Sequence, residues 1–324
     1  EQEQINFFNY GENIDDETIK EFEKTYNIKV NMETFDDMEA MYQKINSGAG
    51  KYDVVLVSDA LMPRMIEKGL VQKLNKDNIP NISQMDKQYL DLDIDPGNQY
   101  SVPYMFGTVG LIYNKDVVKE KVDSWDILWD EKYKDQIFMF DTYRDTIGVA
   151  LKKLGYSLNS TNKDEINEAK ELLLKQRKLV NPIYGVDNGT TMIPAGETNI
   201  NMIWSGEGLN LQAEYPNLVY IVPKEGANFW IDSLCIPSNA KNVSGAEKFI
   251  NFVSDKESAL RIADEIGYTT PNKEARLEQP EEVRNNPNAY MPKEIMDRCE
   301  IYVDLPKDVK KLYDNAWIQI KSSN

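Results

Sequence analysis

The order of apolar and polar positions along the first third of the chain predicts alternating strands and helices. After a first apolar strand, Phe22 and Tyr26 recur at helical spacing, and Asp15 or Asp16 is the expected N-cap of that helix. Strands are expected at residues 5–10, 28–32 and 54–57, with further helices at 36–45 and before Gly69. Such a series favours a mostly parallel sheet covered by helices. Ligands of such sheets bind at the carboxyl ends of the strands, here near residues 9–13 and 58–60.

The remainder of the chain continues this alternation. Strands are expected at residues 110–113, 137–140, 201–204, 219–222 and around 229–237, and helices at 145–154, 163–175, 244–254, 257–266 and 307–321. No tandem repeat, low-complexity segment or flexible linker separates two halves. The pattern therefore predicts an α/β fold of two lobes, joined by several crossovers and closing over a cleft.

Composition narrows the classes of function. A length of 324 residues favours two compact domains. A formal net charge of −17 disfavours nucleic acid and anionic lipid and suits a cationic partner, although acidity also serves solubility. The chain has no histidine, which excludes Ser-His-Asp and Cys-His catalysis and removes the commonest metal ligand. Cys235 and Cys299 form no metal-binding motif and are expected to be small buried residues, so we expect no metal and no cofactor.

The compartment does not follow from composition. No apolar run approaches the roughly 20 residues needed to span a bilayer. The chain opens with a polar stub, residues 1–4, and strand-like residues follow at once without a signal peptide. This start is typical of a mature or trimmed chain.

Several short runs of sequence are similar to those of the spermidine/putrescine-binding proteins of bacterial ABC transporters. They are YDVV at 52–55, YSVPY at 100–104, SWDILW at 124–129, KLGYS at 153–157, MIW at 202–204, FWIDS at 229–233 and IGYTTPN at 266–272. Each run alone is weak, but together they follow the family's order and cover essentially the whole chain. The resemblance implies an extracytoplasmic solute-binding protein that delivers putrescine, spermidine or both to an ABC importer, and that is not an enzyme.

The resemblance also implies an architecture and a location. The fold would be of the periplasmic-binding type, with residues 1–107 plus 232–280 in the first lobe and residues 108–231 plus 281–324 in the second. Gram-positive members are lipoproteins. We therefore expect a protein that is lipid-anchored to the outer face of the cell membrane or periplasmic, with its signal segment absent from this chain. Its partners would be the polyamine and the transporter's membrane permease subunits, without nucleic acid, and it would be a monomer.

Trp204, Trp230 and Asp232 form the core of the expected site. The resemblance implies tryptophans at both aromatic positions of the ligand pocket and a carboxylate two residues after the second. Aromatic faces pack against the methylene groups of a polyamine and attract its ammonium groups, each contact contributing on the order of 0.5–2 kcal/mol. A desolvated ammonium group also requires a carboxylate partner. The structural alternative for both tryptophans is ordinary core packing.

The resemblance extends the ligand site to further positions. They are Tyr10, Gly11, Glu12, Ser58, Asp145, Glu207 and Tyr268. Asp145 stands at an acidic family position, and its alternative role is to cap a helix. Glu207 matches an acid of putrescine-type members, or else is a solvated loop residue, and Tyr268 is a pocket aromatic or the half-buried cap of a core. The departures from spermidine-type members, which leave the preferred polyamine open, are Tyr10, Asn13, Ala60, Thr142 and Val303.

Rival classes stay open from the residues alone. A sugar-binding or ferric-ion-binding protein of the same fold is the nearest rival, although iron sites favour clustered tyrosines with further oxygen or histidine ligands, and histidine is absent. A hydrolase in which Asp145 and Asp232 flank a sugar is more distant. The combination of tryptophans with acids favours an organic cation over these.

Overall fold

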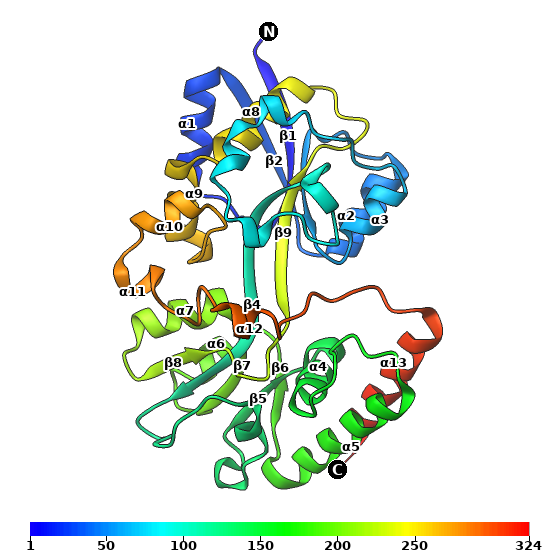
Figure 1. The fold of residues 1–324 in the computed structure, drawn as a ribbon, viewed down its shortest axis with the longest axis vertical. Coiled ribbons are helices and arrows are strands. Elements are labelled where there is room, and N and C mark those ends of the chain that lie inside the picture. Colours follow the sequence, from blue (N-terminus) through cyan, green and yellow to red (C-terminus); the bar gives the residue numbers. More distant parts are fainter. Residues whose placement is uncertain (324) are drawn as a thin grey trace. The chain divides into compact units, whose positions relative to one another are not determined.

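The chain folds into two compact units, which are described separately. A computed structural model describes residues 1–323. Unit 1 comprises Glu1–Phe106 and Trp230–Asn285, and unit 2 comprises Gly107–Phe229 and the residues from Asn286 onward. The chain crosses between the units within strands β4 and β9, which each carry residues of both (Figure 1).

Unit 1 is built on a sheet with the strand order β2-β1-β3-β9. The strands are β1 (Glu3–Tyr10), β2 (Ile28–Phe35), β3 (Val54–Ser58) and β9 (Phe229–Cys235). As predicted, β1 pairs in parallel with β2 and β3, whereas β9 is antiparallel to β3. The carboxyl ends of β1 and β3 therefore lie at the same edge of the sheet as the amino end of β9.

The helices of unit 1 cover both faces of this sheet (Figure 1). They are α1 (Asp16–Tyr26), α2 (Met38–Ser47), α3 (Met62–Glu67), α8 (Val243–Val253), α9 (Lys256–Ile262), α10 (Lys273–Glu278) and α11 (Glu281–Arg284). Successive strand residues point to opposite faces. Phe7 packs with Phe22 of α1 and Phe249 of α8, while Phe8 lies in a separate cluster with Met41 of α2. This alternation turns one sheet into two buried cores.

Side-chain caps fix where the helices of unit 1 begin. Asp15 is the N-cap of α1, as predicted, and accepts a hydrogen bond from the Thr18 amide at 3.0 Å. Asp37 caps α2, so this helix begins slightly later than the expected residue 36. The helix expected at residues 257–266 ends as α9 at Ile262, because a π-helical turn, Ala263–Gly267, replaces its last part.

Unit 2 has a mixed sheet with the strand order β4-β7-β5-β6, and β8 also pairs with β4. Its strands are β4 (Val102–Asn114), β5 (Ile137–Phe140), β6 (Ile183–Gly185), β7 (Ile200–Trp204) and β8 (Leu218–Ile221). β5 is parallel to β6 and β7, and β4 is antiparallel to β7 and β8. β4 begins at Val102, well before the expected residue 110, because the mostly apolar run from Val102 to Ile112 is buried without a break.

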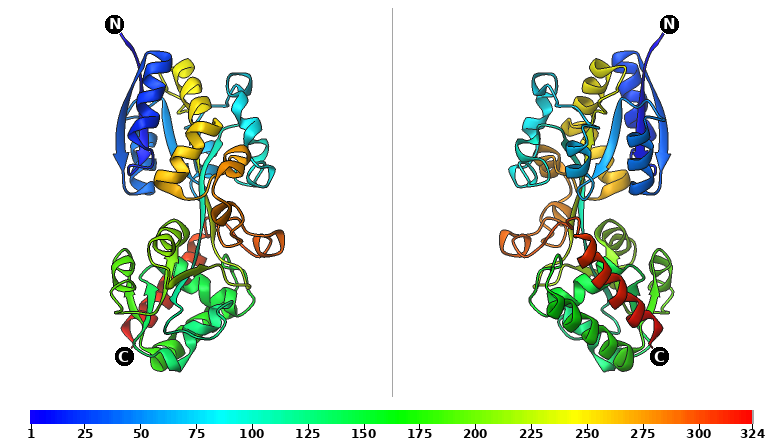
Figure 2. Two further views of the ribbon diagram at one scale, coloured as in Figure 1. Left: turned by 90° about the vertical axis from the view of Figure 1, so that its left-hand side faces the viewer. Right: turned by 90° about the vertical axis from the view of Figure 1, so that its right-hand side faces the viewer.

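The helices of unit 2 include a long pair that packs side by side. They are α4 (Tyr143–Lys153), α5 (Lys163–Val180), α6 (Gly189–Met192), α7 (Ser205–Glu214), α12 (Lys293–Met296) and α13 (Lys307–Ser322). The C-terminal helix α13 lies against α5 and α4 (Figure 2). The C-terminal helix therefore packs on the two helices that follow β5 in the chain.

The cysteines, the apolar character of the helices and the grouping of possible metal ligands are further features of the structure. Both cysteines are free; Cys235 is buried in unit 1 as expected, whereas Cys299 in unit 2 is only half-buried. Over residues 1–323, no helix combines the length and apolar character needed to cross a membrane. Within the same residues, no cluster of three or more acidic, histidine or cysteine side chains is arranged to hold a metal ion.

Candidate functional site

In unit 1, three of the expected ligand residues meet across two neighbouring strands. Ser58, the last residue of β3, is the register partner of Asp232 on β9. Trp230 lies two residues before Asp232 and therefore on the same face of the strand. The Trp230 ring packs on the core beneath α1 and α8 but stays half-buried. Its indole N–H is buried and has no hydrogen-bond partner among residues 1–323.

Asp232 carries a carboxylate whose surroundings oppose its ionisation. Burial, followed by repulsion from Asp59, raises the pKa of Asp232 well above its usual value. Within the described part of the chain, no side chain or amide donates a hydrogen bond to this carboxylate. Such a group gains most from a cation brought by a ligand.

The loop after β1 holds the next group of expected residues. Tyr10 is 38% exposed, and its ring lies edge-on to Phe35, so it points to the face opposite Ser58 and Asp232. Gly11 has a φ of 53°, a left-handed conformation that glycine adopts readily, and its amide bonds to the Phe35 carbonyl. Glu12 is exposed. This loop is anchored one residue later, where the buried Tyr104 hydroxyl donates to the Asn13 carbonyl.

Tyr268 stands in a strained turn. It has φ 64° and ψ −43°, and the Thr269 amide bonds to the Gly267 carbonyl at 2.7 Å, which makes a γ-turn with positive φ. The π-helical turn Ala263–Gly267 leads directly into it. Both features are rare and concentrate at functional sites.

In unit 2, Trp204 lies at the carboxyl end of β7. β7 is the parallel neighbour of β5, so this end lies beside the carboxyl end of β5. The Trp204 ring packs on Phe140, the last residue of β5, with ring centroids 4.4 Å apart. The next residue, Ser205, accepts a hydrogen bond from the Thr108 amide of β4 at 3.0 Å. The contact with Phe140 covers one side of the Trp204 ring, and the residue stays half-buried.

Asp145 lies in the first turn of α4, which follows β5. The N-cap of α4 is Thr142, so Asp145 does not cap the helix. Its two carboxylate oxygens accept hydrogen bonds from the hydroxyls of Thr142 (2.7 Å) and Tyr302 (2.5 Å). Burial raises the pKa of Asp145, although these two bonds and the charge of Arg144 oppose the shift. The protein therefore compensates the charge of this half-buried acid in part.

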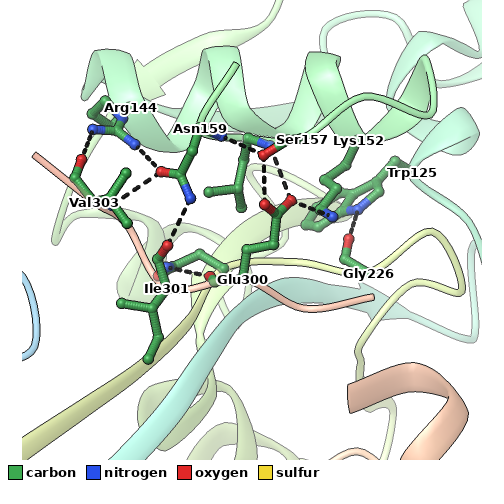
Figure 3. A network of polar contacts seen from close by, with 11 residues as sticks. Trp125, Arg144, Lys152, Ser157, Asn159, Gly226, Glu300, Ile301 and Val303 are labelled. Carbon is green, nitrogen blue, oxygen red and sulfur yellow. Dashed lines mark hydrogen bonds and ion pairs between the residues drawn. The ribbon is translucent and has the colours of Figure 1, made fainter. Parts of the chain in front are cut away.

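Arg144 acts on Asp145 through its charge and also through Tyr302. Its guanidinium lies 4.6 Å from the centroid of the Tyr302 ring and donates to Asn159 Oδ1 and to the Val303 carbonyl. Asn159 in turn bonds to the main chain of Ile301 and Val303 (Figure 3). The segment 301–303 is thus held on the end of α4, which positions the Tyr302 hydroxyl.

The same segment is anchored by an ion pair on its other side. Glu300 pairs with Lys152 of α4 at 2.6 Å and accepts hydrogen bonds from Ser157 and the Leu158 amide (Figure 3). Burial alone raises the pKa of Glu300, but the bonds from Lys152, Ser157 and Leu158 outweigh it and lower that pKa. Glu300 is therefore a structural acid of unit 2.

Glu207 belongs to a helix and is not a loop residue. It lies in the first turn of α7, directly after Trp204, and is half-buried. Burial, and then the charge of Asp187, raises its pKa. An acid in the first turn suits the helix dipole. Glu207 and Trp204 thus come from the same β7–α7 junction, beside the start of α4.

Sequence reasoning missed three residues that shape these two groups. Asp59 is a buried acid next to Ser58, Tyr104 holds the loop after β1, and Tyr302 bonds to Asp145. For Asp59 the signal was present, because an acid at the carboxyl end of a buried strand is unusual. Tyr302 lies far from Asp145 in sequence, and no local pattern joins them.

Comparisons with known proteins identify the class of protein. A family model described as bacterial extracellular solute-binding protein matches residues 17–292. The crystal structure of the spermidine/putrescine ABC transporter substrate-binding protein PotD from Streptococcus pneumoniae matches with a TM-score of 0.93 at 34% identity, covering 98% of each chain. The chain therefore belongs to the bacterial extracellular solute-binding protein family and has the α/β fold of periplasmic-binding proteins.

Relatives whose names state their ligand are similar to this chain over nearly its whole length. The spermidine/putrescine-binding periplasmic protein of Salmonella typhimurium is 35% identical over 318 residues, covering 98% of this chain and 91% of that protein. The putrescine-binding periplasmic protein SpuD of Pseudomonas aeruginosa is 31% identical over 338 residues, covering 98% and 92%. The expected family and fold are thereby confirmed.

Proposed function

We propose that this chain is the polyamine-binding component of a bacterial ABC importer. The observation that carries the proposal is a pairing of tryptophan with acids in each unit. Unit 1 presents Trp230 and Asp232 on one face of β9, and unit 2 presents Trp204 with Glu207 and Asp145 at the ends of β7 and β5. Relatives that are named as spermidine/putrescine-binding and putrescine-binding proteins support the same ligand class.

The chemistry of the two groups suits an organic cation with alkyl segments. A half-buried indole provides a flat surface for methylene groups and attracts a neighbouring ammonium group. An acid whose ionisation is opposed by burial gains from a bound cation, since the two charges then compensate each other. Sugars lack this charge, and so leave Asp232 without compensation. The sugar-binding alternative is therefore disfavoured by the carboxylate of unit 1.

The two groups are proposed to act on one ligand molecule. A diamine has an ammonium group at each end, and acids are available in both units: Asp232 in one, Asp145 and Glu207 in the other. A single polyamine that uses both groups requires one ligand per chain. It also requires that substitutions in either unit weaken binding of the same molecule.

The location and partners are proposed on the same basis. The family consists of extracellular solute-binding proteins, and relatives named periplasmic lie outside the cytoplasm. We propose that this chain acts there as a monomer, attached by a lipid anchor or free, and delivers its ligand to the membrane permease of an importer without converting it.

A thermal-shift screen tests the ligand class. The full chain is melted with polyamines, sugars, amino acids and divalent or ferric ions, each at several concentrations. A ligand at 100 times its Kd adds about 2.7 kcal/mol to the free energy of unfolding. Putrescine or spermidine is expected to raise the melting temperature, and a sugar or an amino acid is not. A shift with a sugar or an iron salt, and none with any polyamine, contradicts the proposal.

A further inference from the structure

Asp59 is a buried acid to which the ligand chemistry above assigns no role. It directly follows β3, is 6% exposed, and its Oδ2 accepts a hydrogen bond from the Ile231 amide at 2.9 Å. Ile231 is the residue between Trp230 and Asp232. The side chain of Asp59 therefore bonds to the main chain that carries both expected ligand residues of unit 1.

The register of the strands explains why this bond matters. Ser58 pairs with Asp232, and β3 ends there. Because the two strands are antiparallel, the β9 residues that precede Asp232 have no partner in the main chain of β3. The Asp59 carboxylate takes over by accepting the Ile231 amide. A buried amide left without an acceptor is costly. Without Asp59, the stretch from Trp230 to Asp232 loses this support.

Asp59 also places a second ionisable acid beside Asp232. Burial raises the pKa of Asp59 to about 7, while hydrogen bonds from the amides of Ile231 and Ala60 oppose the shift. The segments that form this edge of unit 1, residues 9–15, 58–60, 102–106, 230–232 and 267–269, contain no lysine or arginine. Their other titratable groups are Tyr10, Glu12, Asp15, Tyr104 and Tyr268. The edge therefore offers the pair no positive charge of its own.

We propose that Asp59 is a positioning residue for cation binding at Asp232: its carboxylate holds the β9 main chain between Trp230 and Asp232, and its charge leaves Asp232 uncompensated until a ligand ammonium group binds. This inference rests on the proposed function. It extends that function by making binding in unit 1 proton-linked, because an ammonium group favours the ionised pair and displaces a proton from it. Affinity then rises with pH as the unliganded pair loses its proton.

Two substitutions separate the hydrogen bond from the charge. Asp59→Asn keeps an oxygen acceptor for the Ile231 amide and removes the charge, whereas Asp59→Ala removes both. Putrescine and spermidine are titrated calorimetrically into each full-length protein between pH 5.5 and 8, in buffers of different ionisation enthalpy, so that affinity and proton release are both measured.

The expected results differ between the two variants. Wild-type affinity should rise about 10-fold over this pH range, which corresponds to one unit of pKa difference between free and bound protein. Asp59→Asn should bind at pH 8 within about 3-fold of wild type, with a pH dependence reduced to about 3-fold or less and with less proton release. Asp59→Ala should lose about 10-fold or more in affinity at pH 8, because the β9 main chain is no longer held.

Asp53 provides a matched control in the same unit. It is also buried, lies just before β3 at the opposite end of the strand, and accepts hydrogen bonds from the amides of Asn6, Lys241 and Asn242 at 2.7, 3.0 and 2.8 Å. Asp53→Asn should lower the melting temperature and leave both the affinity and its pH dependence unchanged. A purely structural role for Asp59 predicts the same behaviour for Asp59→Asn.

The outcomes distinguish this inference from the proposed function. If wild type binds a polyamine while Asp59→Asn keeps the wild-type pH dependence and proton release, the inference is overturned and the function stands. The same holds if Asp59→Ala, folded by its melting curve, binds as wild type. If wild type binds no polyamine at any pH, the proposed function fails and the inference fails with it.

Discussion

The two units meet the problem of a half-buried acid in opposite ways. In unit 1, Asp232 lies beside a second buried acid, Asp59, and receives no hydrogen bond from the described residues. In unit 2, Asp145 receives hydroxyl bonds from Thr142 and Tyr302, and Arg144 lies over the Tyr302 ring. One carboxylate is left uncompensated by its own protein, and the other is compensated in part.

This difference indicates how each acid contributes to ligand binding and to folding. An acid without a partner destabilises the unliganded protein and gains most from a ligand cation. An acid with internal partners stabilises its own unit and gains less from the ligand, because its charge is already partly satisfied. Affinity should therefore depend most on unit 1, and the stability of the unliganded protein should depend more on the acid of unit 2.

The largest expected effect is that of Asp232→Asn, which keeps the shape of the side chain and removes its charge. Removing one partner of a buried charge pair costs about 2–5 kcal/mol, so affinity for putrescine or spermidine should fall on the order of 30-fold or more. The melting temperature without ligand should stay equal or rise, because repulsion by Asp59 is relieved. Calorimetry and a melting curve measure the two quantities. Affinity within about twofold of wild type, a difference below roughly 0.5 kcal/mol, removes Asp232 from the site.

Asp145→Asn should lower the affinity less than Asp232→Asn does, and should lower the stability of the unliganded protein more. We expect a loss of about 10-fold in affinity, or roughly 1.4 kcal/mol, because Asp145 already receives two hydroxyl bonds. Hydrogen bonds to charged groups contribute about 1.5–3 kcal/mol each, so the unliganded variant should also melt at a lower temperature than wild type. The same titrations and melting curves apply. The proposed difference between the two units is wrong if Asp145→Asn weakens binding more than Asp232→Asn does and leaves the melting temperature unchanged.

Tyr302→Phe tests the support of Asp145 without touching the acid itself. The variant keeps the ring beneath Arg144 and removes the hydroxyl that donates at 2.5 Å. Affinity should change by about 3-fold or less, whereas the unliganded protein should lose about 1.5 kcal/mol or more of stability. Tyr156→Phe is a control from the same unit, since the Tyr156 hydroxyl bonds only to the exposed Glu168 among the described residues. Equal melting temperatures for the two variants would argue against the role of Tyr302.

The smallest expected effect is on the choice between polyamines. Spermidine should be favoured over putrescine by no more than about 10-fold, or roughly 1.4 kcal/mol, because Glu207 adds an acid suited to a short ligand while Thr142 and Ala60 lack groups of spermidine-type members. Glu207→Ser should weaken putrescine more than spermidine. Both ligands are titrated against both proteins at one salt concentration. A wild-type preference for spermidine above a hundredfold, or equal losses in the variant, would contradict this assignment.

Local sequence signals predicted much of the framework. The capping of α1 by Asp15 depends on the Thr18 amide three residues away. The strand β3 is a continuous apolar run whose successive residues enter the two buried cores in turn. Both are short-range effects that a sequence displays directly. The first turn of α4 was also predicted nearly in place, although its N-cap is Thr142.

The organisation around the acids depends on contacts between distant segments. Tyr302 reaches Asp145 only because the segment 300–303 is tied to α4 by Asn159 and Lys152. Likewise, Asp59 meets Ile231 only because β9 adds antiparallel to β3. The residue types of the expected site followed from the family resemblance, but the partners that set their charge required the fold.

The most direct test of the account is a calorimetric titration of putrescine and spermidine into the wild-type chain, with Asp232→Asn and Asp145→Asn measured alongside. We predict one ligand per chain, recovery of the polyamine unchanged, and weaker binding of the same ligand in both variants, with the larger loss in Asp232→Asn. No binding heat with either polyamine, together with binding of a sugar or an amino acid, would contradict the central claim.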